Sequence, residues 1–132
     1  MILDIIALSL ERVLVIVAHP DDIESWCGGV VTHLTALGKE VAYVLCTSGD
    51  KGTSDTTQTP RQVATRREAE QLEAAHILVV EHVTFLRWPD SEVEPTLILR
   101  RELVRQVRIH RPDLVITHDP APLYRQHPDH RA

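Results

Sequence analysis

Runs of apolar residues alternate with amphipathic stretches along the chain. Val13–Ala18 is a continuous and mostly β-branched run, which is typical of a strand buried on both faces of a parallel sheet. Val41–Cys46 repeats this pattern, and shorter apolar runs follow at Val83–Leu86 and Leu114–Thr117. The pattern therefore predicts four strands.

Helical periodicity fills the intervals between the predicted strands. The first amphipathic stretch is expected to end at Gly38, and a second helix is expected from about residue 61 to about residue 78. A third helix should end before Pro112, because proline cannot continue a helix. The apolar positions that define the first and third stretches are Cys27, Val30, Val31, Leu34 and Leu37, and Leu99, Leu103, Val104 and Val107.

The elements follow the order β-α-β-α-β-α-β and end in a loop. Such alternation predicts an α/β fold that is Rossmann-like, with a mostly parallel sheet, right-handed crossovers and helices on both faces. Ligands bind such sheets beyond the carboxyl ends of the strands, where the strand order reverses. This rule directs attention to the residues after Ala18 and after Thr117, and both places hold histidines and aspartates.

Composition narrows the class of protein. A chain of 132 residues suits one domain, and 43% hydrophobic and 25% charged residues are ordinary values for a globular protein. The formal net charge of −5 provides no basic field for nucleic acid or for an anionic membrane. We therefore expect a single domain over residues 1–132 that binds no nucleic acid.

The N-terminal run Met1–Leu10 is apolar but short, and it contains Asp4. Because it lacks a basic start and a small-residue cleavage site, we expect neither a secretory signal nor a membrane span, and we predict a cytoplasmic location. Cys27 and Cys46 do not form a CxxC pair, which favours two free thiols in a reducing compartment.

The first polar cluster, Ala18-His19-Pro20-Asp21-Asp22, directly follows the first predicted strand. Pro20 keeps His19 extended and can begin a tight turn, so that His19 and Asp22 converge from its two sides. The competing interpretation is helix capping, because aspartates before a helix accept hydrogen bonds from its free N–H groups. The histidine at the end of the strand favours a metal site over capping.

The second cluster is His127-Pro128-Asp129-His130. If Pro128 opens a helical turn, His127 and His130 share one face of that turn. A polar surface loop is the alternative interpretation of this cluster alone. Two histidines and one carboxylate drawn from both clusters would leave an open coordination position, which is typical of catalytic zinc, although Fe²⁺ also accepts this ligand set.

These motifs resemble the LmbE-like / PIG-L family of zinc-dependent N-acetylglucosaminyl deacetylases. AHPDD follows a buried strand and HPDH follows a later one, as in that family, and the resemblance covers nearly the whole chain from Val13. The motifs between them are also similar in type and order: TSGDKGT at 47–53, RREAE at 66–70, WPD at 88–90, RPD at 111–113 and HDP at 118–120.

The resemblance implies roles for individual residues. It implies that the metal ligands are His19, Asp22 and His130. It implies that Asp21 is the general base and that His127 polarises the substrate carbonyl and stabilises the oxyanion. Asp129 matches the carboxylate that orients and charges His127.

Substrate contacts are predicted for two further residues. Arg67 matches a substrate-contacting arginine of the family, with Arg66 as the alternative register. Asp90 and Trp88 are candidate sugar contacts, and packing is an equally good interpretation for Trp88.

The sequence departs from the family pattern in two places. Val79 stands where the family usually has glycine after the second helix, which brings the local turn into question. The family continues with further strands after the position of His130, so this chain resembles the amino-terminal portion of a longer fold, an incomplete domain that holds the metal-site residues.

The combined interpretation is a metal-dependent hydrolase. It would remove the acetyl group from an N-acetylglucosamine-type conjugate by attack of a zinc-bound water on the amide. One alternative is a truncated or degenerate metal-binding module of the same fold without activity. A nucleotide-binding domain is disfavoured because no GxGxxG motif follows the first strand. Self-association into a homo-oligomer is left open.

Overall fold

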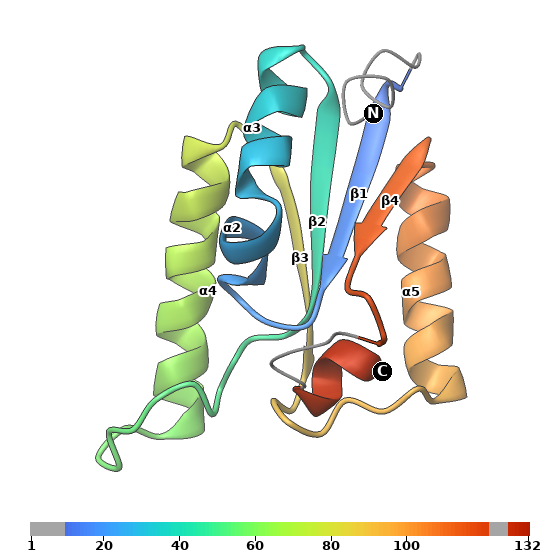
Figure 1. The fold of residues 1–132 in the computed structure, drawn as a ribbon. Helices are drawn as coiled ribbons and strands as arrows, with labels where there is room; N and C mark the ends of the chain where they lie inside the picture. Colours follow the sequence, from blue (N-terminus) through green and yellow to red (C-terminus); the bar gives the residue numbers. More distant parts are fainter. Residues whose placement is uncertain (1–9, 122–126) are drawn as a thin grey trace.

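The computed structural model describes residues 10–121 and 127–132 (Figure 1). Most of the run Met1–Leu10, for which no signal or membrane span was expected, lies outside these residues. No helix within the described ranges combines the length and the apolar character needed to cross a bilayer. The elements are β1 (Arg12–Val17), α2 (Asp22–Trp26), α3 (Gly28–Ala36), β2 (Glu40–Thr47), α4 (Pro60–Ile77), β3 (His82–Trp88), α5 (Leu97–His110), β4 (Leu114–Thr117) and the 3₁₀ helix η1 (Pro128–Arg131).

The four strands form one parallel sheet in the order β3-β2-β1-β4. Val13 lies in register with Val41 of β2 on one side and with Leu114 of β4 on the other. The chain moves outward from β1 to β3 and then returns to the far side of β1, so the strand order reverses between β1 and β4. The predicted α/β fold with a parallel sheet is therefore confirmed.

Helices cover both faces of this sheet (Figure 1). α2, α3 and α4 lie on one face and α5 lies on the other. Val13, Val15 and Val17 belong to the larger core beneath α2, α3 and α4, whereas Leu14 and Ile16 pack in a smaller core with residues of α5. β1 is thus buried on both faces, as its continuous apolar run predicts.

The first predicted helix is divided in two. Cys27 adopts φ −140° and separates α2 from α3, and α2 begins already at Asp22. The N–H of Cys27 still donates to the carbonyl of Ile23 at 2.8 Å, so the chain turns without leaving that backbone group unpaired. Apolar spacing alone did not indicate this division.

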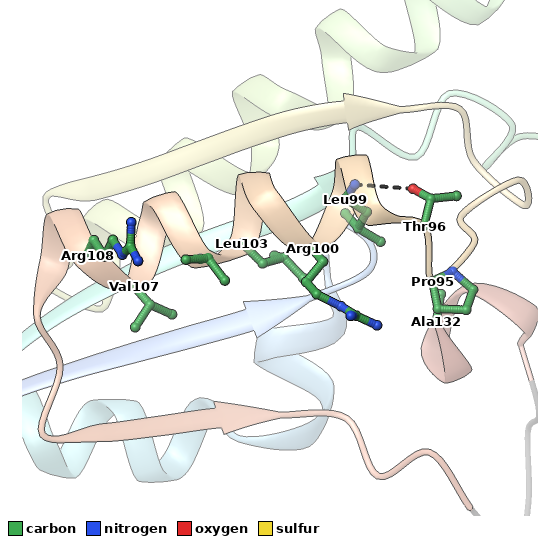
Figure 2. Close-up of a pocket in the computed structure, with 9 residues that line it drawn as sticks. Pro95, Thr96, Leu99, Arg100, Leu103, Val107, Arg108 and Ala132 are labelled. Carbon is green, nitrogen blue, oxygen red and sulfur yellow. Dashed lines mark hydrogen bonds between the residues drawn. The ribbon is translucent and has the colours of Figure 1, made fainter.

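α5 leaves part of its predicted apolar stripe uncovered. Leu99 is buried, but Val104 and Val107 are 42% and 37% exposed. A groove of about 390 Å³ lies beside these residues. Figure 2 shows side chains that line it. Its lining combines apolar and arginine side chains: Pro95, Thr96, Leu99, Arg100, Leu103, Val104, Val107, Arg108 and Ala132.

Gly38 ends α3 in a left-handed conformation, with φ 73°. Its N–H donates to the carbonyl of Thr35 at 2.9 Å, and the N–H of Lys39 donates to the carbonyl of Leu34 at 3.0 Å. These two bonds are those of a Schellman motif, in which glycine is favoured because it carries no Cβ. The predicted helix stop is confirmed.

The same motif ends α4 without a glycine. Val79 takes the left-handed position, with φ 59°, and its N–H donates to the carbonyl of His76 at 3.0 Å. The N–H of Val80 donates to the carbonyl of Ala75 at 2.8 Å. The turn is therefore preserved at Val79, and a β-branched residue holds a conformation that costs roughly 1–2 kcal/mol in a non-glycine residue.

We predict that Val79→Gly stabilises the protein. Relief of the left-handed strain outweighs the backbone entropy of glycine, leaving a gain of roughly 0.5–1 kcal/mol in the free energy of unfolding. Little packing is lost, because Val79 is 71% exposed. Urea denaturation measures the difference, and Gly38→Val should shift the midpoint in the opposite direction. An unchanged or lower midpoint for Val79→Gly would contradict this account of the turn.

The two cysteines are free thiols, and Cys46 is buried. Burial, together with the nearby carboxylates of Asp129, Glu102 and Asp22, raises the pKa of the Cys46 thiol to about 11. The folded protein therefore keeps this proton while the unfolded chain loses it, so the contribution of Cys46 to stability declines as the pH rises from about 9 toward about 11.

We predict that Cys46 resists a thiol reagent at pH 8 in the native protein. The reactive species is the thiolate, which burial suppresses. In a Cys27→Ser variant Cys46 is the sole cysteine, so absorbance after addition of a disulfide reagent reports on it directly. Rapid labelling should appear only in denaturant, and labelling of the native protein at the rate of an exposed thiol would be inconsistent with this burial.

Candidate metal centre

The loops after β1 and β4 meet at the carboxyl edge of the sheet. The carbonyl of Ala18 accepts hydrogen bonds from the N–H and the hydroxyl of Thr47, so the chain remains attached to β2 just before His19. After Pro20 the chain turns, and the side chain of Asp22 accepts the backbone N–H of His19 at 2.8 Å. His19 and Asp22 thus converge across the turn, as the proline predicts.

The capping interpretation of the aspartates is not what the structure shows. Asp21 occupies the N-cap position of α2, but its side chain makes no capping hydrogen bond. The carboxylate of Asp22 turns back toward His19 rather than along the helix.

η1 brings the second cluster to the same place. Pro128 opens a 3₁₀ turn, with His127 at its N-cap. The rings of His127 and His130 lie with their centroids 5.4 Å apart, and each lies near the ring of His19. The side chains of residues distant in sequence therefore share one cluster.

Three ligand-type atoms form a triangle with equal sides at the centre of this cluster. His19 Nδ1 and Asp22 Oδ2 are 3.3 Å apart, and His130 Nε2 lies 3.3 Å from each of them. Atoms bound tetrahedrally at about 2.0–2.1 Å from a zinc ion are separated by roughly 3.3–3.4 Å. The predicted ligand set fits a metal ion of that size, and its role as a ligand set stays a prediction.

The second ring nitrogen of His19 faces carboxylates. His19 Nε2 lies 2.9 Å from Asp129 Oδ2 and 3.3 Å from Asp90 Oδ1. A proton on Nε2 satisfies these oxygens and leaves the lone pair of Nδ1 directed at the triangle, which is how a carboxylate usually supports a metal-binding histidine.

The electrostatics of the triangle favour a positive charge at its centre. Burial lowers the pKa of His19, but its hydrogen bonds with Asp22 and Asp129 outweigh burial and raise it. Burial likewise opposes ionisation of Asp22, yet hydrogen bonds from His118 and His19 hold the pKa of this carboxyl well below its usual range. Asp22 is therefore an anion that requires a compensating cation or proton.

The pKa of His130 shifts in the opposite direction to that of His19. Burial lowers its pKa, and the neighbouring His118, His19 and His127 lower it further against the attraction of Asp22. The imidazole of His130 is therefore held in the neutral form, which has a lone pair to offer a metal ion.

Asp129 contacts His19 more closely than it contacts His127. Its buried carboxylate accepts the N–H groups of Ser91 at 2.7 Å and Val93 at 3.1 Å, besides its bond with His19. His127 Nδ1 lies 3.9 Å from this carboxylate and accepts the N–H of Asp129 at 3.3 Å. The structure thus brings the two predicted partners together, with the shorter carboxylate contact made to His19.

A polar cleft of about 530 Å³ opens over the triangle. The carboxylate of Asp21 is 76% exposed there, and the half-buried His127 lines the same cleft. The cleft contains every residue predicted for the site except the buried Asp129: His19, Asp21, Asp22, Arg67, Asp90, His127 and His130.

The two predicted substrate contacts are already engaged with the protein. Arg67 donates to the carbonyls of Pro20 and Gly49, at 2.8 and 3.2 Å, and to the carboxylate of Asp21 at 3.1 Å. Asp90 is buried and contacts His19. Both border the cleft, and their role as substrate contacts stays a prediction.

The site also contains His118, Gln71 and Trp26, for which the sequence predicts no role. His118 lies 3.2 Å from Asp22 Oδ2 and stacks on His130, with centroids 4.0 Å apart. Its position just after the fourth strand was the available signal. Gln71 accepts the N–H of Asp21, and Trp26 lines the cleft, whereas Trp88 donates to Glu102 and packs in the core.

Known proteins are similar to this chain over most of its length. The GlcNAc-PI de-N-acetylase family, PIG-L, matches residues 14–132. The chain is 38% identical over 122 residues to diacetylchitobiose deacetylase of Thermococcus kodakarensis, covering 92% of this chain and 46% of the relative. It is 33% identical over 143 residues to 1D-myo-inositol 2-acetamido-2-deoxy-alpha-D-glucopyranoside deacetylase of Mycobacterium leprae, covering 90% of this chain and 46% of the relative.

A solved structure with the same fold is also a deacetylase. The solved structure of N,N'-diacetylchitobiose deacetylase from Pyrococcus horikoshii, in complex with its inhibitor MPG, superposes with a TM-score of 0.90 and 32% identity. The match covers 97% of this chain and 51% of that structure. The chain thus spans about half the length of the relatives that it matches.

We predict that the chain binds one divalent ion through the triangle. In a Co²⁺ titration followed by visible absorbance, His130→Ala and Asp22→Asn should lose at least the roughly 10–100-fold in affinity that removal of a supporting residue costs. His82→Ala is a matched control, because His82 begins β3 at the opposite edge of the sheet. Equal affinities for the parent and both triangle variants would contradict the ligand assignment.

Proposed function

The chain belongs to the PIG-L family of de-N-acetylases, and from this premise we propose that it removes the acetyl group from N-acetylglucosamine-type amino sugars by metal-assisted hydrolysis. The observation that carries the proposal is the 3.3 Å triangle of His19, Asp22 and His130 beneath a polar cleft. Relatives named for diacetylchitobiose and for a glucosaminyl-inositol support this substrate class.

Zinc is the metal proposed for the site. Two histidines and one carboxylate leave a coordination position open, as in catalytic zinc sites. A zinc ion held there would lower the pKa of a coordinated water toward ~7 and polarise the amide carbonyl. Fe²⁺ accepts the same ligands and is the alternative metal, since hydrolysis requires no redox change.

Asp21 is the proposed general base. Its exposed carboxylate borders the cleft next to the triangle, where it can accept the proton of the attacking water. His127 packs edge-to-face on His19 with centroids 4.5 Å apart, and from there it can donate to the carbonyl oxygen as negative charge develops. The departing amine then receives a proton from Asp21 or His127.

Three further residues border the cleft or support its histidines. Asp90 borders the cleft and is a candidate substrate contact. Arg67 also borders the cleft, with its guanidinium bonded to the carboxylate of Asp21. Asp129 is proposed to orient the histidines, since its carboxylate lies between His19 and His127 at 2.9 and 3.9 Å. The cytoplasmic location rests on the sequence alone and stays a prediction, and self-association stays open.

A metal-binding module without turnover is the second candidate. The two candidates agree on metal binding and differ only in whether acetate is released from an amino sugar.

We predict that the zinc-loaded chain releases acetate from N,N'-diacetylchitobiose and that Asp21→Asn lowers the rate by roughly 10²–10⁴-fold with zinc retained, because the base is lost and the ligands are not. His127→Ala should cost roughly 10²–10³-fold. Proton NMR of acetate and metal analysis by mass spectrometry measure the two quantities.

Glu81→Gln is the control, because it makes the same carboxylate-to-amide change at an exposed position just before β3, far from the carboxyl edge. Zinc lost from Asp21→Asn to the same extent as from Asp22→Asn would refute the role of Asp21. Metal bound without acetate release in the parent would favour the second candidate.

A further inference from the structure

Asp21 has an unusual backbone for the residue that carries the proposed base. It adopts φ 78° in the left-handed region, at the start of α2. A non-glycine residue persists in such a conformation only where its surroundings hold it there, and residues held in this way concentrate at functional sites.

Two residues one turn apart on α4 hold Asp21 in place. The side chain of Gln71 is buried and accepts the backbone N–H of Asp21 at 2.9 Å. Nη2 of Arg67 donates to the carbonyl of Pro20 at 2.8 Å and to the carboxylate of Asp21 at 3.1 Å. Both polar groups of the Pro20–Asp21 peptide, and the carboxylate of Asp21 itself, are therefore attached to one face of α4.

Arg67 reaches Asp21 through a gap formed by two glycines in the loop after β2. Nη1 of Arg67 donates to the carbonyl of Gly49 at 3.2 Å. A Cβ on Gly49 would lie 2.7 Å from Cζ of Arg67, and a Cβ on Gly52 would lie 2.9 Å from the same atom and nearer still to Nη1. Any side chain at either glycine would displace the guanidinium.

Gly52 is the more informative of the two. Gly49 has φ 62°, so its backbone alone favours glycine, but Gly52 has no positive φ. A Cβ at position 52 would therefore meet the guanidinium of Arg67 first, and the carbonyl of Gly49 at 3.1 Å.

We propose that Arg67 is a positioning residue which, with Gln71, fixes the carboxylate of Asp21 at the metal cleft, and that Gly49 and Gly52 form the opening that admits its guanidinium. The inference rests on the proposed function, because it assigns Arg67 to the orientation of the proposed base. The side chain of Arg67 is only 14% exposed, and its donors already have three protein acceptors.

A double-mutant cycle on thermal unfolding tests the gap without any turnover. In the parent, Gly52→Ala should lower Tm by roughly 5 °C, the scale of an overpacking penalty in a chain of this size. In the Arg67→Ala background the same change should cost less than about 2 °C, because the blocking side chain is gone. Gly29→Ala, an exposed helical glycine with open space around it, is the control and should not lower Tm.

Equal losses in both backgrounds overturn the proposal, since Gly52 would then be required for another reason. If Gly52→Ala does not fold, a folded double variant Gly52→Ala/Arg67→Ala supports the proposal and an unfolded one overturns it.

Kinetics of the zinc-loaded chain separate positioning from substrate contact. Arg67→Ala should lower kcat by roughly 10–100-fold with KM changed less than about threefold and zinc retained, and Arg67→Lys should recover part of the loss. Arg61→Ala is the control, because Arg61 is an exposed arginine in the first turn of α4 that does not line the cleft. A raised KM with unchanged kcat overturns positioning in favour of substrate contact. Absence of turnover in the parent refutes the proposed function, and the unfolding cycle still decides whether Arg67 fills the gap.

Discussion

One carboxylate oxygen holds the two halves of the site together. Asp22 Oδ2 accepts the backbone N–H of His19 at 2.8 Å and lies within 3.3 Å of a ring nitrogen on each of His19, His118 and His130. A buried anion is tolerated only when its surroundings supply compensating charge and donors. The segments after β1 and β4 therefore converge on Asp22, and the site requires a cation or a shared proton at its centre.

Much of the fold could be predicted from the sequence because local pattern and tertiary environment agree. Val13–Ala18 is apolar on every position, and only a strand covered on both faces can bury it. The break at Cys27 and the left-handed Val79 could not be predicted in this way, because neither a cysteine nor a β-branched valine favours these conformations locally.

The residues that gather at the candidate site could be predicted from the sequence, but the contacts between them could not. Proline after His19 and proline before Asp129 indicated where the chain turns, so both clusters could be assigned to the carboxyl edge. The partner of Asp129 depends on the loop after β3, whose N–H groups at Ser91 and Val93 hold the carboxylate beside His19. The route of Arg67 depends on the loop after β2. Neither loop has a periodicity from which its course could be predicted.

The triangle and the rim of the cleft belong to different parts of the fold. The donor atoms of the triangle belong to segments fastened to the sheet: His19 follows β1 directly, and His130 is stacked on His118, which follows β4. The rim of the cleft includes residues of loops, such as Lys51 after β2 and Ser91 after β3. Changes in the rim alter what the cleft admits and leave the triangle in place. If the rim varies independently of the triangle, related proteins should differ in their substrates. Two relatives are indeed named for different substrates, a chitobiose and an inositol conjugate.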